Sequence, residues 1–461
     1  MIPHTLGTLR QYSAAVSASL SVFIIGNWLA WPSSAVKEIL SGQTKLTISS
    51  EEVSWAVALL DLGNIISPIP SSYISDWIGR KLTLVIMSFA LFSTWLLTIF
   101  GTNAYYLYIA RLIAGLCKGI SFTVVPIYLG EIASTNIRGG IGTIFCGLMN
   151  YGMLYELCIG PLVSYETLNI LSSPFPVLFF LLFFRFPESP YFFLMKGRTA
   201  EAQMSLAWFR NLKEDSSELD MEMKRISANV EEDMKDKGGF KDLLSNAGVR
   251  KAMLIAMSLA LLQRLSGMSS IIAFSAVTLP ATGGYFSPEV YMLFFGITSI
   301  VGQSICVILI DKFGRKPLLI VSNAGCALST GISALFYWLN TSTDLTDYNW
   351  VPYFCVILFG IMFTIGIGTI PSVICVELFS SDIRSYAASA AAMFYALGSF
   401  ITNKLYLYVH LTIGVHYMFL FFTVSSLVCL VFTCTVFFET NGKSFPEIQN
   451  ILQNRVTNDQ P

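Results

Sequence analysis

Arginine and glutamate residues recur at matching positions about half a chain apart, where their types and spacing could form ion pairs. The repeated residues, in chain order, are Arg80, Glu131, Arg138 and Glu188, then Arg315, Glu377, Arg384 and Glu439. Each set begins with the pattern Asp-x-x-Gly-Arg-Lys, and in each set seven residues separate the first glutamate from the second arginine. A guanidinium group is a planar fork that binds carboxylates. We therefore predict that Arg80 binds Glu131 and that Arg315 binds Glu377.

A second candidate for chemistry is Arg264, which follows Gln263 in a long apolar segment. A guanidinium in the middle of a membrane costs between about 3 and 10 kcal/mol or more unless it is paired or hydrated. The acidic residues most clearly inside other apolar segments are Asp61 and Glu156. Two alternatives follow: Arg264 contacts an anionic or strongly polar solute, or it forms a fixed ion pair that locks helices together.

The segments that must position these residues are long and apolar. The chain has 461 residues, of which 54% are hydrophobic and 12% charged, against roughly 25% charged in a soluble domain, which excludes an ordinary cytosolic enzyme. About 20 apolar residues make a helix that crosses a bilayer. We predict an all-α membrane protein with 12 transmembrane helices, at residues 12–32, 54–74, 82–101, 105–129, 139–163, 168–186, 249–279, 289–310, 317–338, 352–376, 385–409 and 412–438.

The repeat and the charge distribution organise these helices. Matching motifs in the same order indicate a tandem duplication of a six-helix unit. An even number of helices per unit gives both copies the same orientation, which is the parallel-repeat arrangement of the major facilitator superfamily. The predicted divisions are a bundle at 1–194, a central loop with short helices at 195–247, a second bundle at 248–440 and a tail at 441–461.

Basic residues set the predicted orientation. One set of loops and tails holds ten of them outside the central loop, whereas the opposite set holds only Lys37 and Lys45. By the positive-inside rule, the basic set and both termini are cytoplasmic in this multi-pass protein, for which we expect the plasma membrane. The glycosylation sequon at Asn340 then lies outside. The net charge of -1 offers no basic surface for nucleic acid.

In this orientation each half closes a cytoplasmic cluster of arginine and glutamate between its first and second three-helix groups. Such clusters can hold the inner ends together only while a central cavity faces outward, so we predict a gating role for them. The alternative is that the charges only fix the topology. A topology signal needs no acidic partner at fixed spacing, which favours gating for the Glu131/Arg138 and Glu377/Arg384 pairs.

A resemblance to a known family rests on a series of motifs in order. They are the two Asp-x-x-Gly-Arg-Lys motifs, Pro-Ile-Tyr-Leu-Gly-Glu-Ile-Ala at 126–133, Pro-Glu-Ser-Pro at 187–190, Gln-Arg-Leu-Ser-Gly at 263–267 and Glu-Thr-Asn-Gly-Lys-Ser at 439–444. Over residues 10–450 the chain resembles the sugar porter family, and within it the insect facilitated trehalose transporters. The resemblance implies facilitated diffusion of trehalose or a hexose by alternating access, with no cofactor and no enzyme activity. It also implies that Arg111 joins the cytoplasmic cluster and that short helices at 195–247 latch the two halves.

The resemblance also implies a substrate site, although the chain departs from the family there. Related porters line the cavity with glutamine, asparagine and aromatic residues. The matching positions here are Gln263, Arg264, Ser269, Cys146, Ser299, Thr364, Ser372 and Tyr395. Only Gln263 keeps the polar type that the family uses. Two alternatives therefore stay open: a transport-deficient sugar sensor, and a porter of a different polar solute.

Energy coupling is predicted from what the first apolar segment contains. Proton-driven sugar porters generally keep an acidic residue there, and residues 11–36 have none. Facilitated diffusion is therefore favoured over proton symport, although Asp61 or Glu156 could substitute. No phosphate-binding loop of the Walker type occurs in the sequence, which argues against ATP-driven transport. The oligomeric state is left open.

Overall fold

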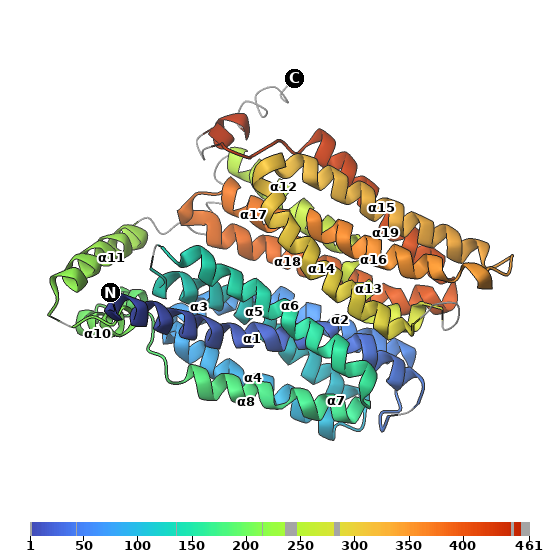
Figure 1. Ribbon diagram of the computed structural model, residues 1–461, viewed down its shortest axis with the longest axis horizontal. Coiled ribbons are helices and arrows are strands. Elements are labelled where there is room, and N and C mark those ends of the chain that lie inside the picture. The colour runs from blue at the N-terminus through green and yellow to red at the C-terminus, as the bar shows by residue number, and fades with distance from the viewer. Residues whose placement is uncertain are drawn as a thin grey trace.

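The computed structural model describes residues 2–42, 44–134, 136–213, 215–235, 247–280, 286–443 and 447–452. In these ranges the regular structure is helical and no strand occurs. Two bundles of long helices lie side by side, one built from the first half of the chain and one from the second (Figure 1).

The first bundle ends in a short set of helices that connects it to the second. Its helices are α1 (Ile2–Leu40), α2 (Ser50–Ile66), α3 (Pro68–Ile78), α4 (Arg80–Phe100), α5 (Ala104–Ile132), α6 (Arg138–Ile159), α7 (Tyr165–Ser172) and α8 (Pro174–Phe183). The connecting helices are α9 (Pro190–Met195), α10 (Thr199–Arg210) and α11 (Ser217–Lys235). Residues 236–246 of the predicted central loop lie outside the described ranges.

The second bundle repeats this plan. Its helices are α12 (Ala247–Leu265), α13 (Met268–Thr278), α14 (Pro288–Phe313), α15 (Arg315–Leu339), α16 (Trp350–Ile365), α17 (Ile370–Leu378), α18 (Ser381–Thr412) and α19 (Val415–Thr435). Between the bundles, α1 packs on α13, α2 on α18 and α6 on α14. The predicted all-α membrane fold is confirmed, and its helices form two bundles.

Length and composition identify most, but not all, of the predicted membrane crossings. Within the described residues, nine helical segments are long and apolar enough to cross a membrane, or ten if α2 and α3, which meet at a 53° bend, form one crossing. The other two predicted spans correspond to α6 and α18. These helices have 22 and 32 residues, which is long enough to cross, but both carry several polar residues. The count of twelve therefore stays a prediction.

Four predicted spans are single segments in the sequence but broken helices in the structure. The breaks fall between α2 and α3, α7 and α8, α12 and α13, and α16 and α17. A proline opens the helix after three of these breaks, where its missing N–H costs no hydrogen bond. The break after α12 has Gly267 at φ 102°, a conformation that favours glycine. These breaks free backbone groups in the middle of the molecule.

Small residues allow helices within the first bundle to approach closely. Gly63 of α2 and Gly115 of α5 face each other, and a Cβ atom at either would collide with the backbone of the other helix. Such contacts are typical of helix packing in membranes, where van der Waals packing replaces the hydrophobic effect. The close α2–α5 contact brings Asp61 and Lys118 within bonding distance, at 3.2 Å.

Candidate functional site

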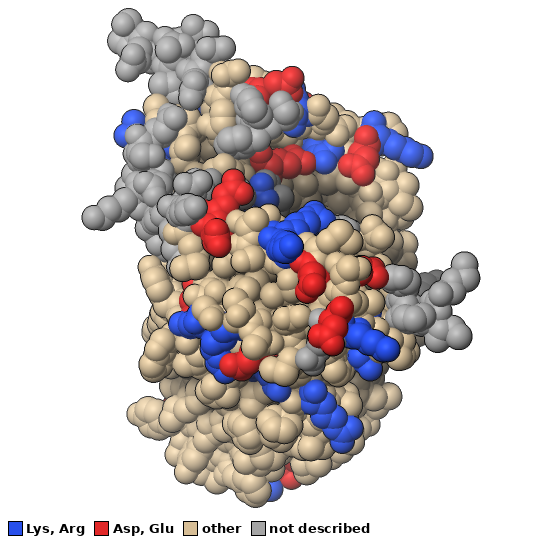
Figure 2. Space-filling model, turned by 90° about the vertical axis from the view of Figure 1, so that its left-hand side faces the viewer, with Lys and Arg blue, Asp and Glu red and all other residues tan. Residues whose placement is uncertain are grey.

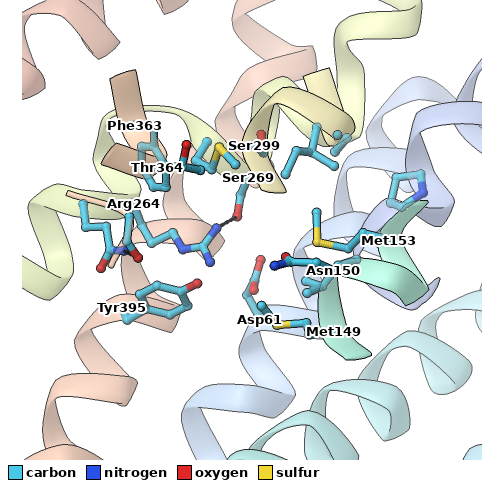
Figure 3. A pocket seen from close by; sticks show the side chains of 18 of the residues that line it. Asp61, Met149, Asn150, Met153, Arg264, Ser269, Ser299, Phe363, Thr364 and Tyr395 are labelled. Carbon is cyan, nitrogen blue, oxygen red and sulfur yellow. Dashed lines mark hydrogen bonds between the residues drawn. The ribbon is translucent and has the colours of Figure 1, made fainter. Parts of the chain in front are cut away.

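A central cavity lies between the two bundles. Its walls come from α1, α2, α5 and α6 on one side and from α12, α13, α14, α16 and α18 on the other. Asn150 from the first bundle and Arg264, Ser269 and Tyr395 from the second point toward this space (Figure 3). The site therefore belongs to neither half alone.

The break between α12 and α13 presents three of the predicted residues to the cavity. Gln263 lies in the last turn of α12, and its Nε2 donates to the carbonyl of Gly368, 3.0 Å away. Arg264 Nη1 donates to Ser269 Oγ at 3.0 Å, and Ser269 Oγ lies 3.0 Å from Ser399 Oγ. Gln263, Arg264 and Ser269 all line the cavity.

Arg264 has an aromatic neighbour but no carboxylate partner among the described residues. Its guanidinium carbon lies 3.8 Å from the centroid of the Tyr395 ring. Asp61 instead binds Lys118 and accepts a hydrogen bond from Asn403, at 2.8 Å, and Glu156 accepts one from Ser172, at 2.6 Å. The predicted ion pair of Arg264 with Asp61 or Glu156 is therefore absent.

Other predicted lining residues divide into two groups. Ser299, Thr364 and Tyr395 line the cavity, although the hydroxyls of Ser299 and Thr364 donate to carbonyls of their own helices, at 2.7 and 2.8 Å. Cys146 and Ser372 do not belong to the lining. Cys146 is exposed on α6, one helical turn before Asn150, and Ser372 is exposed and donates to the carbonyl of Thr369.

Sequence reasoning missed polar residues from both halves that line the cavity. Asn150 Nδ2 of α6 donates to Gln303 Oε1 of α14 at 2.6 Å, which joins the two bundles. Asn403 of α18 joins them a second time through Asp61. Lys118 of α5 is 2% exposed and also lines the cavity. The signal that could have identified Asn150 and Gln303 is a polar amide side chain within a predicted apolar segment.

The two ends of the molecule differ. We call the end where α4 and α15 begin the basic end; charged side chains gather on this face, as Figure 2 shows. At the opposite end, which we call the closed end, the ammonium of Lys37 on α1 binds the carboxylate of Glu289 on α14. There Ser54 Oγ also donates to the carbonyl of Lys404, at 2.6 Å, and the Lys404 ammonium lies 4.4 Å from the Trp55 ring centroid. Contacts between the halves thus seal the cavity at the closed end.

The first half has the predicted arginine–glutamate cluster at its basic end. Arg80 Nη2 lies 3.0 Å from Glu131 Oε1, which joins the start of α4 to the end of α5. The Glu188 carboxylate accepts from the backbone N–H of Lys81 at 2.9 Å, so it caps the start of α4. Burial raises the pKa of Glu188 above its usual value. Hydrogen bonds from the backbone N–H groups of Ser189 and Lys81, and the charge of Arg80, lower this pKa but do not cancel the effect of burial.

The second half repeats the cluster. Arg315 Nη2 lies 2.8 Å from Glu377 Oε1, and Thr440 Oγ1 donates to the other oxygen of Glu377 at 2.6 Å. Glu439 accepts from the backbone N–H groups of Arg315 and Lys316, each at 2.9 Å. Burial alone would raise the pKa of Glu439, but four backbone N–H donors together bring that pKa below its usual value. Both predicted pairs, Arg80 with Glu131 and Arg315 with Glu377, are therefore present.

Two other arginines, Arg138 and Arg384, differ from the prediction. Arg138 donates to the carbonyl of Gly130 at 3.4 Å, and Arg384 donates to the carbonyl of Phe379 at 3.2 Å. Neither forms an ion pair with the glutamate seven residues before it in the described part of the chain. Instead, each lies against the backbone that links one helix to the next.

Arg111 lies far from the cluster that it was expected to join. It is seven residues from the start of α5, whereas Glu131 is near the end of this helix, about 30 Å away at 1.5 Å per residue. Its guanidinium is 2% exposed and donates to the carbonyls of Trp28, Ala56 and Val57, at 2.6, 3.1 and 3.2 Å. Arg111 thus ties α5 to α1 and α2 beside the cavity.

The sequon, the connecting helices and the C-terminal tail lie outside the two bundles. Asn340 is exposed where α15 ends, at the end opposite the basic end. The connecting helix α10 is bonded to the first half, because Arg10 Nη1 donates to the carbonyl of Trp208 at 2.8 Å. In the tail, Gln449 donates to the carbonyl of Leu378 at 3.1 Å. Glycosylation at Asn340 and a latch by α10 and α11 on both halves stay predictions.

Comparisons with known proteins agree with this architecture. The chain is 30% identical over 441 residues to the facilitated trehalose transporter Tret1 of Bombyx mori, with 95% of this chain and 86% of that protein covered. It is 28% identical over 450 residues to Tret1 of Anopheles gambiae. That alignment covers 97% of this chain but only 56% of the length of the Anopheles protein. It superimposes on the inward-open conformation of the xylose transporter XylE from E. coli with a TM-score of 0.78 and 19% identity, over 96% of this chain and 99% of that one. This structural similarity, at 19% sequence identity, shows that the two chains share a fold. A model of the family described as "Sugar (and other) transporter" matches residues 10–452, so the chain belongs to that family.

Proposed function

We propose that the protein is a membrane transporter that moves a sugar or a similar polyhydroxylated solute by facilitated diffusion and alternating access. The observation that carries this proposal is the cavity between the bundles, which is sealed between the halves at one end by Lys37 and Glu289. Its lining offers amide groups of Asn150 and Gln303 from opposite halves. Amides both donate and accept hydrogen bonds, as sugar hydroxyls require. The relatives named as trehalose transporters support trehalose or a hexose as the first solutes to test.

In this proposal the basic end is cytoplasmic, following the positive-inside rule, and the protein resides in the plasma membrane. The described conformation is then inward-facing, because the contacts between halves at the closed end lie on the outer side. The pairs Arg80–Glu131 and Arg315–Glu377 are each formed within one half in this inward-facing conformation, so they do not by themselves close the cytoplasmic end, contrary to the expectation from the sequence. Their gating role in this proposal is to keep each half rigid, so that the halves can meet at the cytoplasmic end as rigid bodies. Asn340 is then extracellular and open to glycosylation.

Uptake measurements test the transport function. The full chain is expressed in oocytes, its surface level is measured by biotinylation, and uptake of labelled trehalose and glucose is compared with uptake in uninjected cells. We expect saturable uptake that Gln303→Ala reduces, because this change removes the amide that faces Asn150. Ser304→Ala is the matched control, since the exposed Ser304 hydroxyl donates to the carbonyl of Ile300 in its own helix. If no solute is taken up although the protein reaches the surface, the transport function is wrong and the sensor alternative gains support.

A further inference from the structure

The cavity lining has an excess of positive charge. Among the described residues that line it, the cations are Arg111, Lys118 and Arg264, and the one carboxylate is Asp61. These groups sum to a charge of +2, counted as three cations and one anion. Uncompensated charge within a membrane is costly. An anionic group on the solute would offset this excess, whereas a neutral sugar would not.

Two of the three cations already have protein partners. Arg111 donates to three backbone carbonyls, and Lys118 binds Asp61 at 3.2 Å. Arg264 has one hydrogen bond, from Nη1 to Ser269 Oγ. Its Nε is buried without a hydrogen-bond partner, and Nη2 has none among the described residues. Of the three cations, Arg264 is therefore the one with unused hydrogen-bond donors.

The geometry of Arg264 suits a carboxylate. The Tyr395 ring, 3.8 Å from the guanidinium carbon, covers one face of the group and holds its plane. The bond to Ser269 occupies one nitrogen of the fork. Nε and Nη2, which carry the unpaired donors, form one edge of the guanidinium, and this edge can donate to both oxygens of a carboxylate in a bidentate pair. Asn150 faces the same space from the first bundle (Figure 3).

We propose that the solute is a sugar acid, a polyhydroxylated molecule with one carboxylate, and that Arg264 binds the carboxylate through Nε and Nη2. This inference rests on the proposed transport function. The hydroxyls of the solute then meet the amides of Asn150 and Gln303 on the wall formed by α6 and α14. Arg264 thereby sets the specificity for an acid over a neutral sugar of the same size.

Binding to the purified full chain tests the inference directly. Isothermal titration measures the Kd of glucuronate, glucose and acetate. We expect glucuronate to bind more tightly than either of the others, because only glucuronate supplies both the carboxylate and the hydroxyls. Arg264→Gln should weaken glucuronate about tenfold to hundredfold, the range that hydrogen bonds to charged groups produce, and should leave glucose unchanged.

Two further variants keep the test independent of folding. Arg264→Lys keeps the charge without the fork, so it should weaken glucuronate less than Arg264→Gln does. Lys45→Gln removes a cation that binds Glu166 within the first half and lies outside the cavity lining, and it should leave the Kd of glucuronate unchanged. Equal binding of glucose and glucuronate by the unaltered chain would overturn the inference. So would acetate that binds as tightly as glucuronate, since the site would then hold an adventitious ion only.

Uptake separates this inference from the proposed function. Labelled glucuronate should enter oocytes that express the chain, and unlabelled glucuronate should compete better than glucose. If neutral sugars enter and glucuronate neither enters nor competes, the sugar-acid inference fails while transport stands. If the purified chain binds glucuronate but nothing enters the cells, transport fails while the carboxylate site at Arg264 stands.

Discussion

The ion pair between Lys37 and Glu289 should hold the closed end shut, and Glu289→Gln should open it. The pair joins α1 of the first half to α14 of the second. The Glu289 side chain is 10% exposed and the Lys37 side chain 50% exposed, so the pair is neither fully buried nor free in solvent. Exposed pairs contribute about 0.2–1 kcal/mol, and loss of one partner from a buried pair costs about 3–5 kcal/mol.

For a partly exposed pair we take about 1 kcal/mol, the upper part of the exposed range. Removal of this energy from one of two states multiplies the ratio of open to closed forms about fivefold, since about 1.4 kcal/mol gives tenfold. The glutamine keeps the shape of Glu289 and removes only its charge. Lys37→Met should have a similar effect, and the double variant should add little to either, because both remove the same bond.

Labelling from outside measures this shift. Leu29→Cys places a thiol in the cavity wall, eight residues before Lys37 on α1 and so about 12 Å deeper along the helix. A membrane-impermeant maleimide then labels intact cells, and labelling of the parent with its nine native cysteines is subtracted. Glu289→Gln should raise the labelling rate at Leu29→Cys about fivefold.

Glu166→Gln is the matched control. Glu166 binds Lys45 at 2.9 Å at the same end of the molecule, but both residues belong to the first half. Loss of this pair should leave the labelling rate unchanged. If Glu289→Gln has no effect, or if Glu166→Gln raises labelling equally, the contact between the halves does not hold the closed end shut.

Three further predictions concern stability, measured by thermal unfolding in detergent. Gly314→Ala should cost about 1–3 kcal/mol, because Gly314 has φ 86° and an added Cβ would lie 2.6 Å from Glu439 Oε2; Gly130→Ala, where a Cβ meets nothing within 4 Å, should cost nothing. Arg111→Lys should cost about 1–3 kcal/mol, since one ammonium cannot replace the guanidinium fork that reaches α1 and α2; an unchanged unfolding temperature would contradict this. Glu188 has a raised pKa, so its contribution is present below pH 4.5 and falls as the pH rises above it, whereas Glu439 has a lowered pKa, so its contribution is present above pH 4.5 and falls below it. Glu188→Gln and Glu439→Gln should therefore change the slope of stability against pH in opposite directions, and equal changes would refute the assignment.

The duplicated motifs predicted the basic-end clusters because their bonds are local to each half. Arg80 and Glu131 begin and end consecutive long helices, so the loop between two antiparallel helices is enough to bring neighbouring ends of one bundle together. The same reasoning applies to Arg315 and Glu377. It fails for Arg138 and Arg384, because residue types and spacing do not reveal that backbone carbonyls at the ends of the preceding helices are nearer than the glutamates.

The error at Arg111 has a different cause. The predicted span of residues 105–129 already put Arg111 near one end of a helix and Glu131 beyond the other. The family resemblance overrode this simple geometry. A residue's distance along a helix is fixed by the rise of 1.5 Å per residue, so in such cases the sequence position is the stronger guide.

The cavity lining could be predicted only in part. Gln263 and Arg264 lie in one motif and Ser269 lies two residues after it, on the two sides of a helix break that Gly267 makes possible, and the structure brings them together. Asn150 and Gln303 lie 153 residues apart, and their bond depends on how two separate bundles meet. The hydrophobic periodicity of one helix does not reveal how two separate bundles pack against each other. Residues at such an interface therefore need the tertiary structure.

The location of the polar bonds favours movement of the halves as rigid bodies. Among the described residues, four polar side-chain bonds are seen to cross between the halves: Lys37 with Glu289, Ser54 with Lys404, Asp61 with Asn403, and Asn150 with Gln303. At about 1 kcal/mol each, they sum to about 4 kcal/mol, which a matching set of contacts at the basic end could offset. The side-chain hydrogen bonds and ion pairs within each half, such as Arg80 with Glu131 and Arg315 with Glu377, are more numerous in the described part of the chain. An exchange of contacts between the two ends therefore needs no change inside either bundle, and the solute at Arg264 would lie where the two halves pivot.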